Sequence, residues 1–141
     1  MMIFIVDVNV VISALMKKGK SRELLIDSPF MLYSPETLIS SIRKYEGLIL
    51  EKSGLSKEDF ETLLSLIIEH IEIIEKEEYE KHLEEADKLI GHIDKEDVPY
   101  IALASSRVND GIWSDDRHFQ QQKKIKIWKT EDIIKAMGKL N

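Results

Sequence analysis

The feature that most constrains the fold of this chain is a short apolar segment near its start that ends in an acid. Ile3–Val6 contains only β-branched and aromatic side chains and is too short for a stable helix. An apolar run without polar alternation is typical of a strand buried on both faces, as in a parallel sheet. We therefore predict a strand over residues 3–7 that ends at Asp7, followed by a helix over residues 9–16.

Downstream, segments typical of strands alternate with segments typical of helices. Further strands are expected over residues 30–33, 71–74, 111–114 and 125–128, and further helices are expected to begin near residues 21, 34, 56, 97 and 130. The third helix should be capped by Ser34, should carry Pro35 in its first turn, and should run to about Lys52. This alternation predicts an α/β fold with a central, mostly parallel sheet flanked by helices, in one domain over residues 1–141.

Composition excludes several classes of protein. The chain has no cysteine, which excludes a disulfide scaffold, a zinc–thiolate site and a cysteine nucleophile. Its longest uncharged runs, residues 8–16 and 98–106, are nine residues each, whereas a membrane span needs about 20. The P-loop and dinucleotide-binding glycine patterns are absent. A cysteine-free sequence rich in Glu and Lys favours a cytoplasmic protein, with no membrane partner, from a thermophilic prokaryote.

The net charge of −6 is unevenly distributed along the chain. Residues 48–97 carry sixteen acidic and six basic side chains, whereas residues 1–47 and 98–141 are each neutral to slightly basic. A polyanion such as a nucleic acid can therefore still meet a basic face, although the chain as a whole is acidic.

Several acids are expected at one edge of the sheet, where ligands bind in open α/β folds. They are Asp7 at the end of the first strand, Asp94 and Asp97 before the helix that begins near residue 97, and Asp115 and Asp116 after the strand at 111–114. Carboxylates brought together repel one another, and a divalent cation offsets that cost. Mg²⁺ suits such a site because it keeps positions open for phosphate oxygens and can activate water.

Each of these acids also has a purely structural interpretation. Asp97 stands before Val98-Pro99 and is a suitable helix cap, and Asp115 and Asp116 suit an ordinary turn. Asp7 favours function more strongly, because an acid that closes a fully apolar strand is desolvated. Of the four histidines, only His118 stands close to the expected site.

Three stretches, taken together, resemble motifs of the PIN domain, a family of metal-dependent ribonucleases with an α/β/α sandwich fold. Ile3–Leu15 resembles the first motif, Asp97–Ala104 the third, and Ile112–Phe119 the fourth, and the resemblance covers essentially the whole chain. It implies that Asp7, Asp97 and Asp116 are catalytic and bind Mg²⁺ or Mn²⁺. It also implies supporting roles for Asn9 and Ser114, with Asp94 and Asp115 nearby.

The second motif departs from the family pattern. The family usually supplies a glutamate from the helix after the second strand, and the matching position here is Ser41. Glu46 and Glu36 are each five residues away, which places them about 140° around a helix from that position. Either a shifted register presents one of them, or the site holds three acids, which would weaken metal binding.

The resemblance predicts an endoribonuclease that hydrolyses phosphodiester bonds of single-stranded RNA. Lys17, Lys18, Lys20 and Arg22 follow the first motif and can guide the RNA backbone, although a solvated loop is an equally good interpretation. Because many members of this family are toxins, the resemblance also suggests a toxin–antitoxin pair, with an antitoxin protein or a second copy of the chain as partners.

Two other functions compete with this one. A non-catalytic PIN-like module that binds RNA or a protein partner is favoured by Ser41. A receiver-like phospho-acceptor domain also gathers acids at strand ends, but it needs two adjacent acids after the first strand and a lysine at the end of a later strand. The sequence Asp7-Val8-Asn9 does not provide the acid pair.

Overall fold

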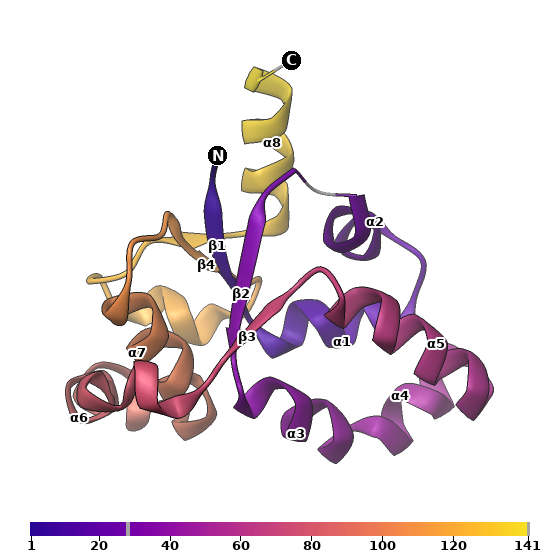
Figure 1. Ribbon diagram of the computed structural model, residues 1–141, viewed down its shortest axis with the longest axis horizontal. Helices are drawn as coiled ribbons and strands as arrows, with labels where there is room; N and C mark the ends of the chain where they lie inside the picture. Colours follow the sequence, from indigo (N-terminus) through magenta and orange to yellow (C-terminus); the bar gives the residue numbers. More distant parts are fainter. Residues whose placement is uncertain (28, 141) are drawn as a thin grey trace.

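A five-stranded parallel sheet forms the centre of the molecule (Figure 1). The computed structural model describes residues 1–27 and 29–140, and for residues 139 and 140 it describes the backbone alone. The strands are β1 (Ile3–Val6), β2 (Met31–Pro35), β3 (Glu72–Ile74), β4 (Gly111–Trp113) and β5 (Ile127–Trp128), in the spatial order β3-β2-β1-β4-β5. All four neighbouring pairs are parallel, so the expected mostly parallel sheet is parallel throughout.

The first strand is buried on both faces, as its apolar sequence predicts. Phe4, Ile5 and Val6 are fully buried, and Ile5 pairs with Tyr33 of β2 on one side and with Ile112 of β4 on the other. β1 is thus the central strand, and the residue that follows it emerges at the middle of the sheet's carboxyl edge.

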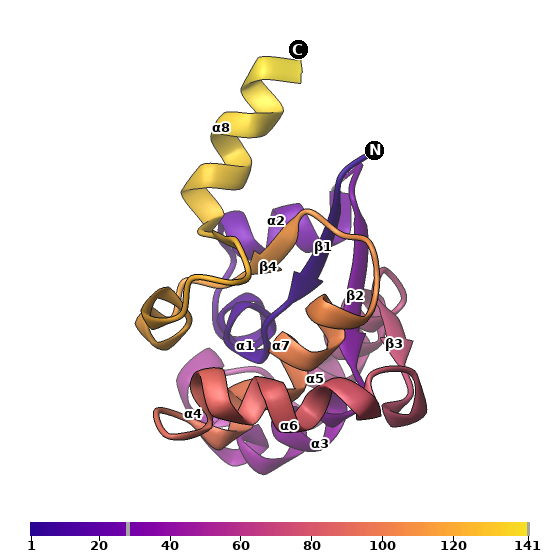
Figure 2. The same cartoon turned by 90° about the vertical axis from the view of Figure 1, so that its left-hand side faces the viewer.

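Helices cover both faces of this sheet, which confirms the expected α/β/α sandwich (Figures 1 and 2). On one side α7 (Val98–Ser106) packs against β1, β2 and β4. On the other side α1 (Val8–Met16) packs against a group made of α2 (Lys20–Asp27), α3 (Thr37–Lys44), α4 (Glu46–Ser53) and α5 (Lys57–Ile68). The residues between β3 and α7 form short helical turns and α6 (Leu83–Ala86), which packs on α7.

The last helix, α8 (Thr130–Leu140), projects away from the body of the molecule (Figure 2). Its start is fixed to the sheet, because the indole Nε1 of Trp113 donates to the hydroxyl of Thr130 at 3.0 Å. Among the described residues, we find no helix whose length and apolar character would allow it to cross a bilayer.

The expected helix from Ser34 to about Lys52 is wrong in two respects. It is divided at Tyr45 into α3 and α4, because the Tyr45 N–H turns back to the Ile42 carbonyl in a tighter, 3₁₀-like bond. Ser34 is not a helix cap: it belongs to β2, and its buried hydroxyl donates to the Val6 carbonyl at 2.9 Å. That bond joins the carboxyl ends of β1 and β2.

Candidate metal centre

The candidate centre begins where β1 and β4 end side by side. Asp7 follows β1, and its backbone N–H donates to the Trp113 carbonyl at the end of β4 at 3.0 Å. Ser114 is the next residue after β4, and it is fully buried, as is Asp7. The parallel pairing of β1 and β4 therefore brings together residues that are 107 positions apart in the sequence.

Ser114 links two of the acids through one hydroxyl. Its Oγ donates to Oδ2 of Asp7 at 2.8 Å and accepts the backbone N–H of Asp116 at 3.0 Å. A buried serine in this position orients the Asp7 carboxylate and fixes the turn that carries Asp116. Ser114, for which a supporting role was expected, thus lies between Asp7 and Asp116.

The carboxylate of Asp116 accepts two hydrogen bonds. The amide Nδ2 of Asn9, from the first turn of α1, donates to Oδ2 of Asp116 at 2.9 Å, and the His118 backbone N–H donates to Oδ1 at 2.9 Å. Asp116 thus caps the 3₁₀ helix over Arg117–Gln121, and the Asn9 bond also directs this carboxylate toward the start of α1, next to Asp7.

Asp97, Asp94 and His118 form the other half of the cluster. The ring Nδ1 of His118 lies 3.3 Å from Oδ2 of Asp94, 3.9 Å from Oδ2 of Asp97 and 3.6 Å from Oδ1 of Asp116. One ligand atom from each of Asp94, Asp97 and His118 lies within 4.8 Å of the others, which is close enough for one ion. Asp97 occupies the N-cap position of α7, as the cap interpretation expects, but its side chain makes no capping hydrogen bond.

Two buried carboxylate oxygens in this cluster, Oδ1 of Asp7 and Oδ2 of Asp97, have no hydrogen-bond partner among the described residues, and Nδ1 of His118 has only contacts of 3.3–3.9 Å with carboxylates. Buried polar atoms are normally satisfied, and leaving one without a partner costs about 1–3 kcal/mol. Carboxylate oxygens with an imidazole nitrogen are a donor set that divalent cations accept. The residues present therefore fit a bound cation.

Burial and mutual repulsion raise the pKa values of two of the acids. The pKa of Asp7 rises to about 7, chiefly because burial penalises the charged form, with repulsion from Asp116 added and the Ser114 bond opposing it. The pKa of Asp97 rises to about 8, again chiefly through burial and then through repulsion from Asp94, Asp7 and Asp116. Without a cation, Asp7 and Asp97 therefore resist ionisation near neutral pH.

The remaining acid expected nearby, Asp115, has a different role. Its carboxylate accepts the backbone N–H of Thr130 at 2.9 Å and the Thr130 hydroxyl at 2.6 Å. Asp115 therefore fixes the start of α8, while its neighbour Asp116 belongs to the cluster.

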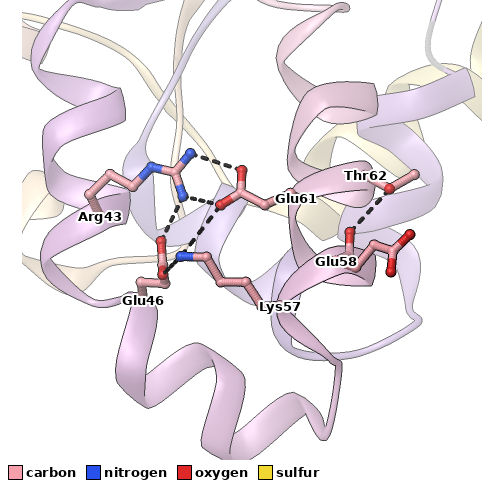
Figure 3. A network of polar contacts seen from close by, with 6 residues as sticks. All are labelled: Arg43, Glu46, Lys57, Glu58, Glu61 and Thr62. Atoms are coloured by element: carbon pink, nitrogen blue, oxygen red, sulfur yellow. Dashed lines mark hydrogen bonds and ion pairs between the residues drawn. The ribbon is translucent and has the colours of Figure 1, made fainter.

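Neither glutamate near the second motif reaches the centre. Glu46 is held by Arg43 and Lys57, which also contact Glu61, in a network between α3, α4 and α5 (Figure 3). Glu36 accepts the backbone N–H of Lys76, beyond the end of β3. A shifted register does not supply the missing glutamate through either residue.

Ser41 lies beside the centre rather than remote from it. It lines a surface hollow of about 420 Å³ together with Glu96 and Pro99, the neighbours of Asp97 and Val98. The ammonium of Lys44 spans this region to reach Glu96 at 2.7 Å. Position 41, where the resemblance would place a glutamate, thus lies near the residues that flank Asp97 and carries an uncharged serine.

The four basic residues after the first motif separate into two kinds. Lys17, Lys18 and Lys20 are exposed and line a polar hollow between α1 and the start of α8. Arg22 is half-buried, and its Nε donates to the Ala14 carbonyl at 2.7 Å, which ties α2 to α1.

Two residues near the cluster were not assigned roles from the sequence. His118 was noted only for its position, yet its ring faces three carboxylates, and its spacing of two residues from Asp116 was the available signal. Tyr100 is buried on α7, and its pKa is raised by burial and then by the charge of Asp7. Nothing in the sequence pattern distinguished Tyr100 from an ordinary core aromatic residue.

Comparison with known families agrees with this geometry. The PIN domain family matches residues 5–137, which is nearly the whole chain, and the chain therefore belongs to the PIN domain family. Members of this family are generally nucleases and typically use a divalent metal ion. No curated protein matches the chain.

Proposed function

We propose that this chain is a Mg²⁺- or Mn²⁺-dependent endoribonuclease that hydrolyses phosphodiester bonds of single-stranded RNA. The observation that carries the proposal is the convergence of Asp7, Asp97 and Asp116 at one sheet edge, where two buried carboxylate oxygens accept no hydrogen bond from the described residues. A cation held there supplies an activated water and stabilises negative charge on phosphate oxygens.

The residues of the chain have distinct tasks in this proposal. Asp7, Asp97 and Asp116 hold the cation, and Asp94 and His118 extend the donor set on the Asp97 side. Ser114 and Asn9 keep Asp7 and Asp116 in place by hydrogen bonds. Preorganised donors of this kind need no rearrangement when the substrate arrives.

The direct test is a cleavage assay with labelled single-stranded RNA, titrated with Mg²⁺ and with Mn²⁺. We expect metal-dependent internal cleavage by the native chain and loss of most of it in Asp116→Asn. Asp59→Asn, at an exposed acid in the first turn of α5, is the matched control and should retain full activity. Absence of cleavage by the native chain with both metals would exclude the enzyme.

A non-catalytic module that binds RNA or a protein partner is the second candidate, and Ser41 is the observation that favours it. A toxin role with an antitoxin partner stays a prediction from the family resemblance.

Substitution Ser41→Glu is expected to restore a missing ligand. A glutamate here would extend from the hollow shared with Glu96 and Pro99 and add one carboxylate beside Asp97. We expect Mn²⁺ to bind about tenfold more tightly, by calorimetry, and the cleavage rate to rise. Ser65→Glu, at an exposed position of α5 outside this hollow, is the control for added charge. Equal effects of the two substitutions would show that position 41 does not face the centre.

A further inference from the structure

A polar hollow of about 430 Å³ lies next to the metal centre but outside it. Its lining includes Ser13, Lys17, Lys18, Lys20, Asp115 and Thr130. Two features connect it to the centre: Ser13 is one turn of α1 beyond Asn9, and Asp115 directly precedes Asp116. The hollow and the acid cluster therefore share α1 and the segment that follows β4 as walls.

The charges around this hollow suit an anion. Lys17 and Lys18 have no ion pair among the described residues, and Lys20 has only an exposed contact of 3.5 Å with Glu23. Among the described residues that line it, Asp115 is the one carboxylate, and both of its oxygens are already bonded to Thr130. The first backbone N–H groups of α2, which begins at Lys20, also lack partners within that helix.

We propose that this hollow binds a backbone phosphate of the RNA other than the one that is cleaved. Lys17 is eight residues beyond Asn9 along α1, which corresponds to about 12 Å of helix rise. At that separation the lysines are suited to hold a neighbouring phosphate of the strand while the metal centre holds the phosphate that is cleaved.

The acid cluster gives a physical reason for such a second site. Asp7, Asp94, Asp97 and Asp116 repel a polyanion, and a single divalent cation offsets only part of that charge. Two unpaired lysines beside the cluster attract the neighbouring backbone and release its counterions. This inference rests on the proposed function for the identity of the ligand. Arg22 is not part of it, because Arg22 does not line this hollow.

The test compares RNA binding by Lys17→Gln/Lys18→Gln with a matched control. Lys52→Gln/Lys81→Gln removes the same charge from exposed lysines that have no described ion pair and line none of the hollows described above. Anisotropy of a short labelled single-stranded RNA, in an Asp116→Asn background that leaves it uncleaved, gives the dissociation constant. We expect Kd to rise about tenfold for the Lys17/Lys18 pair, with a salt slope reduced by about 0.7 per lost contact. The control pair should change Kd by less than about twofold.

Two further measurements make the result specific. Titration with inorganic phosphate should shift the backbone amide resonances of Gly19, Lys20 and Ser21 in the native chain but not in the lysine variant. In turnover experiments the lysine variant should raise KM and leave kcat unchanged. If the Lys17/Lys18 variant raises Kd for both 5′-hydroxyl and 5′-phosphorylated RNA, the hollow binds an internal backbone phosphate, as proposed. If it raises Kd for the 5′-phosphorylated RNA alone, the hollow binds a terminal phosphate and the proposal is wrong.

Failure of this inference differs from failure of the proposed function. If the native chain cleaves RNA and the two lysine pairs give equal Kd values, the hollow is not a phosphate site and the nuclease stands. If the native chain binds RNA but does not cleave it, the proposed nuclease activity is excluded. The ratio of Kd for the Lys17/Lys18 variant to Kd for the control pair then still tests whether the hollow binds phosphate. If no RNA binds and phosphate shifts no amide, both are excluded.

Discussion

Replacing Asp7 by asparagine should make the folded protein more stable at pH 8 and reduce RNA cleavage by at least about a hundredfold. The Asp7 carboxyl is fully buried, and its pKa is raised from 3.8 to about 7, so at pH 8 the folded state carries an unfavourable buried charge. Three pKa units correspond to roughly 4 kcal/mol, and asparagine, which cannot ionise, removes this penalty. The same change deletes a carboxylate from the cation site, so stability and function respond in opposite directions.

Denaturant unfolding at pH 8 without metal, run beside the cleavage assay, measures both effects. Asp59→Asn again serves as the control, because the Asp59 carboxyl is exposed and its charge is not buried. This substitution should change the free energy of unfolding by less than about 0.5 kcal/mol. A loss of stability in Asp7→Asn at pH 8 would contradict the buried-charge account. Cleavage unchanged by the substitution would exclude Asp7 from the site.

Metal-free protein should lose stability as pH rises from about 4 to 8, and Mg²⁺ or Mn²⁺ should restore it. The folded-state pKa values of Asp7 and Asp97 lie at about 7 and about 8, above the value of 3.8 for an unperturbed aspartate. The folded state therefore binds more protons than the unfolded state across this interval, so the free energy of unfolding falls as pH increases and levels off above about 8. This is the reverse of a salt-bridged acid, whose contribution is lost on acidification.

A cation binds the ionised carboxylates and not the protonated ones, so its effect should grow with pH. We expect Mn²⁺ in excess to raise the melting temperature by several degrees at pH 8 and by almost nothing at pH 5. Thermal unfolding at both pH values, with EDTA and with metal, measures this difference. In Asp97→Asn both the pH slope and the metal effect should shrink. An equal shift at pH 5 and pH 8 would indicate binding elsewhere.

The local sequence predicted most of the elements because their signals are short-range. Ile3–Val6 has no polar alternation and forms the fully paired central strand, and Ser56 caps α5 through the Asp59 N–H as its sequence indicates. Local signals failed at Ser34 and Tyr45. A Ser-Pro-Glu sequence suits a helix cap, but pairing of β2 with β1 and β3 includes Ser34 and Pro35 in the strand. Propensity cannot anticipate such tertiary pairing.

The sequence by itself determined the α/β class and the placement of acids after strands, because hydrophobic periodicity and strand-terminal residues are properties of neighbouring positions. Only the tertiary structure decided which acids meet. It put Asp116 with Asn9 and Asp115 with Thr130, although the two aspartates are adjacent, and it turned His118 toward Asp94 and Asp97. Those choices depend on the parallel pairing of β1 with β4 and on the position of α7. Contacts between residues separated by up to 107 positions leave no signal in the local sequence pattern.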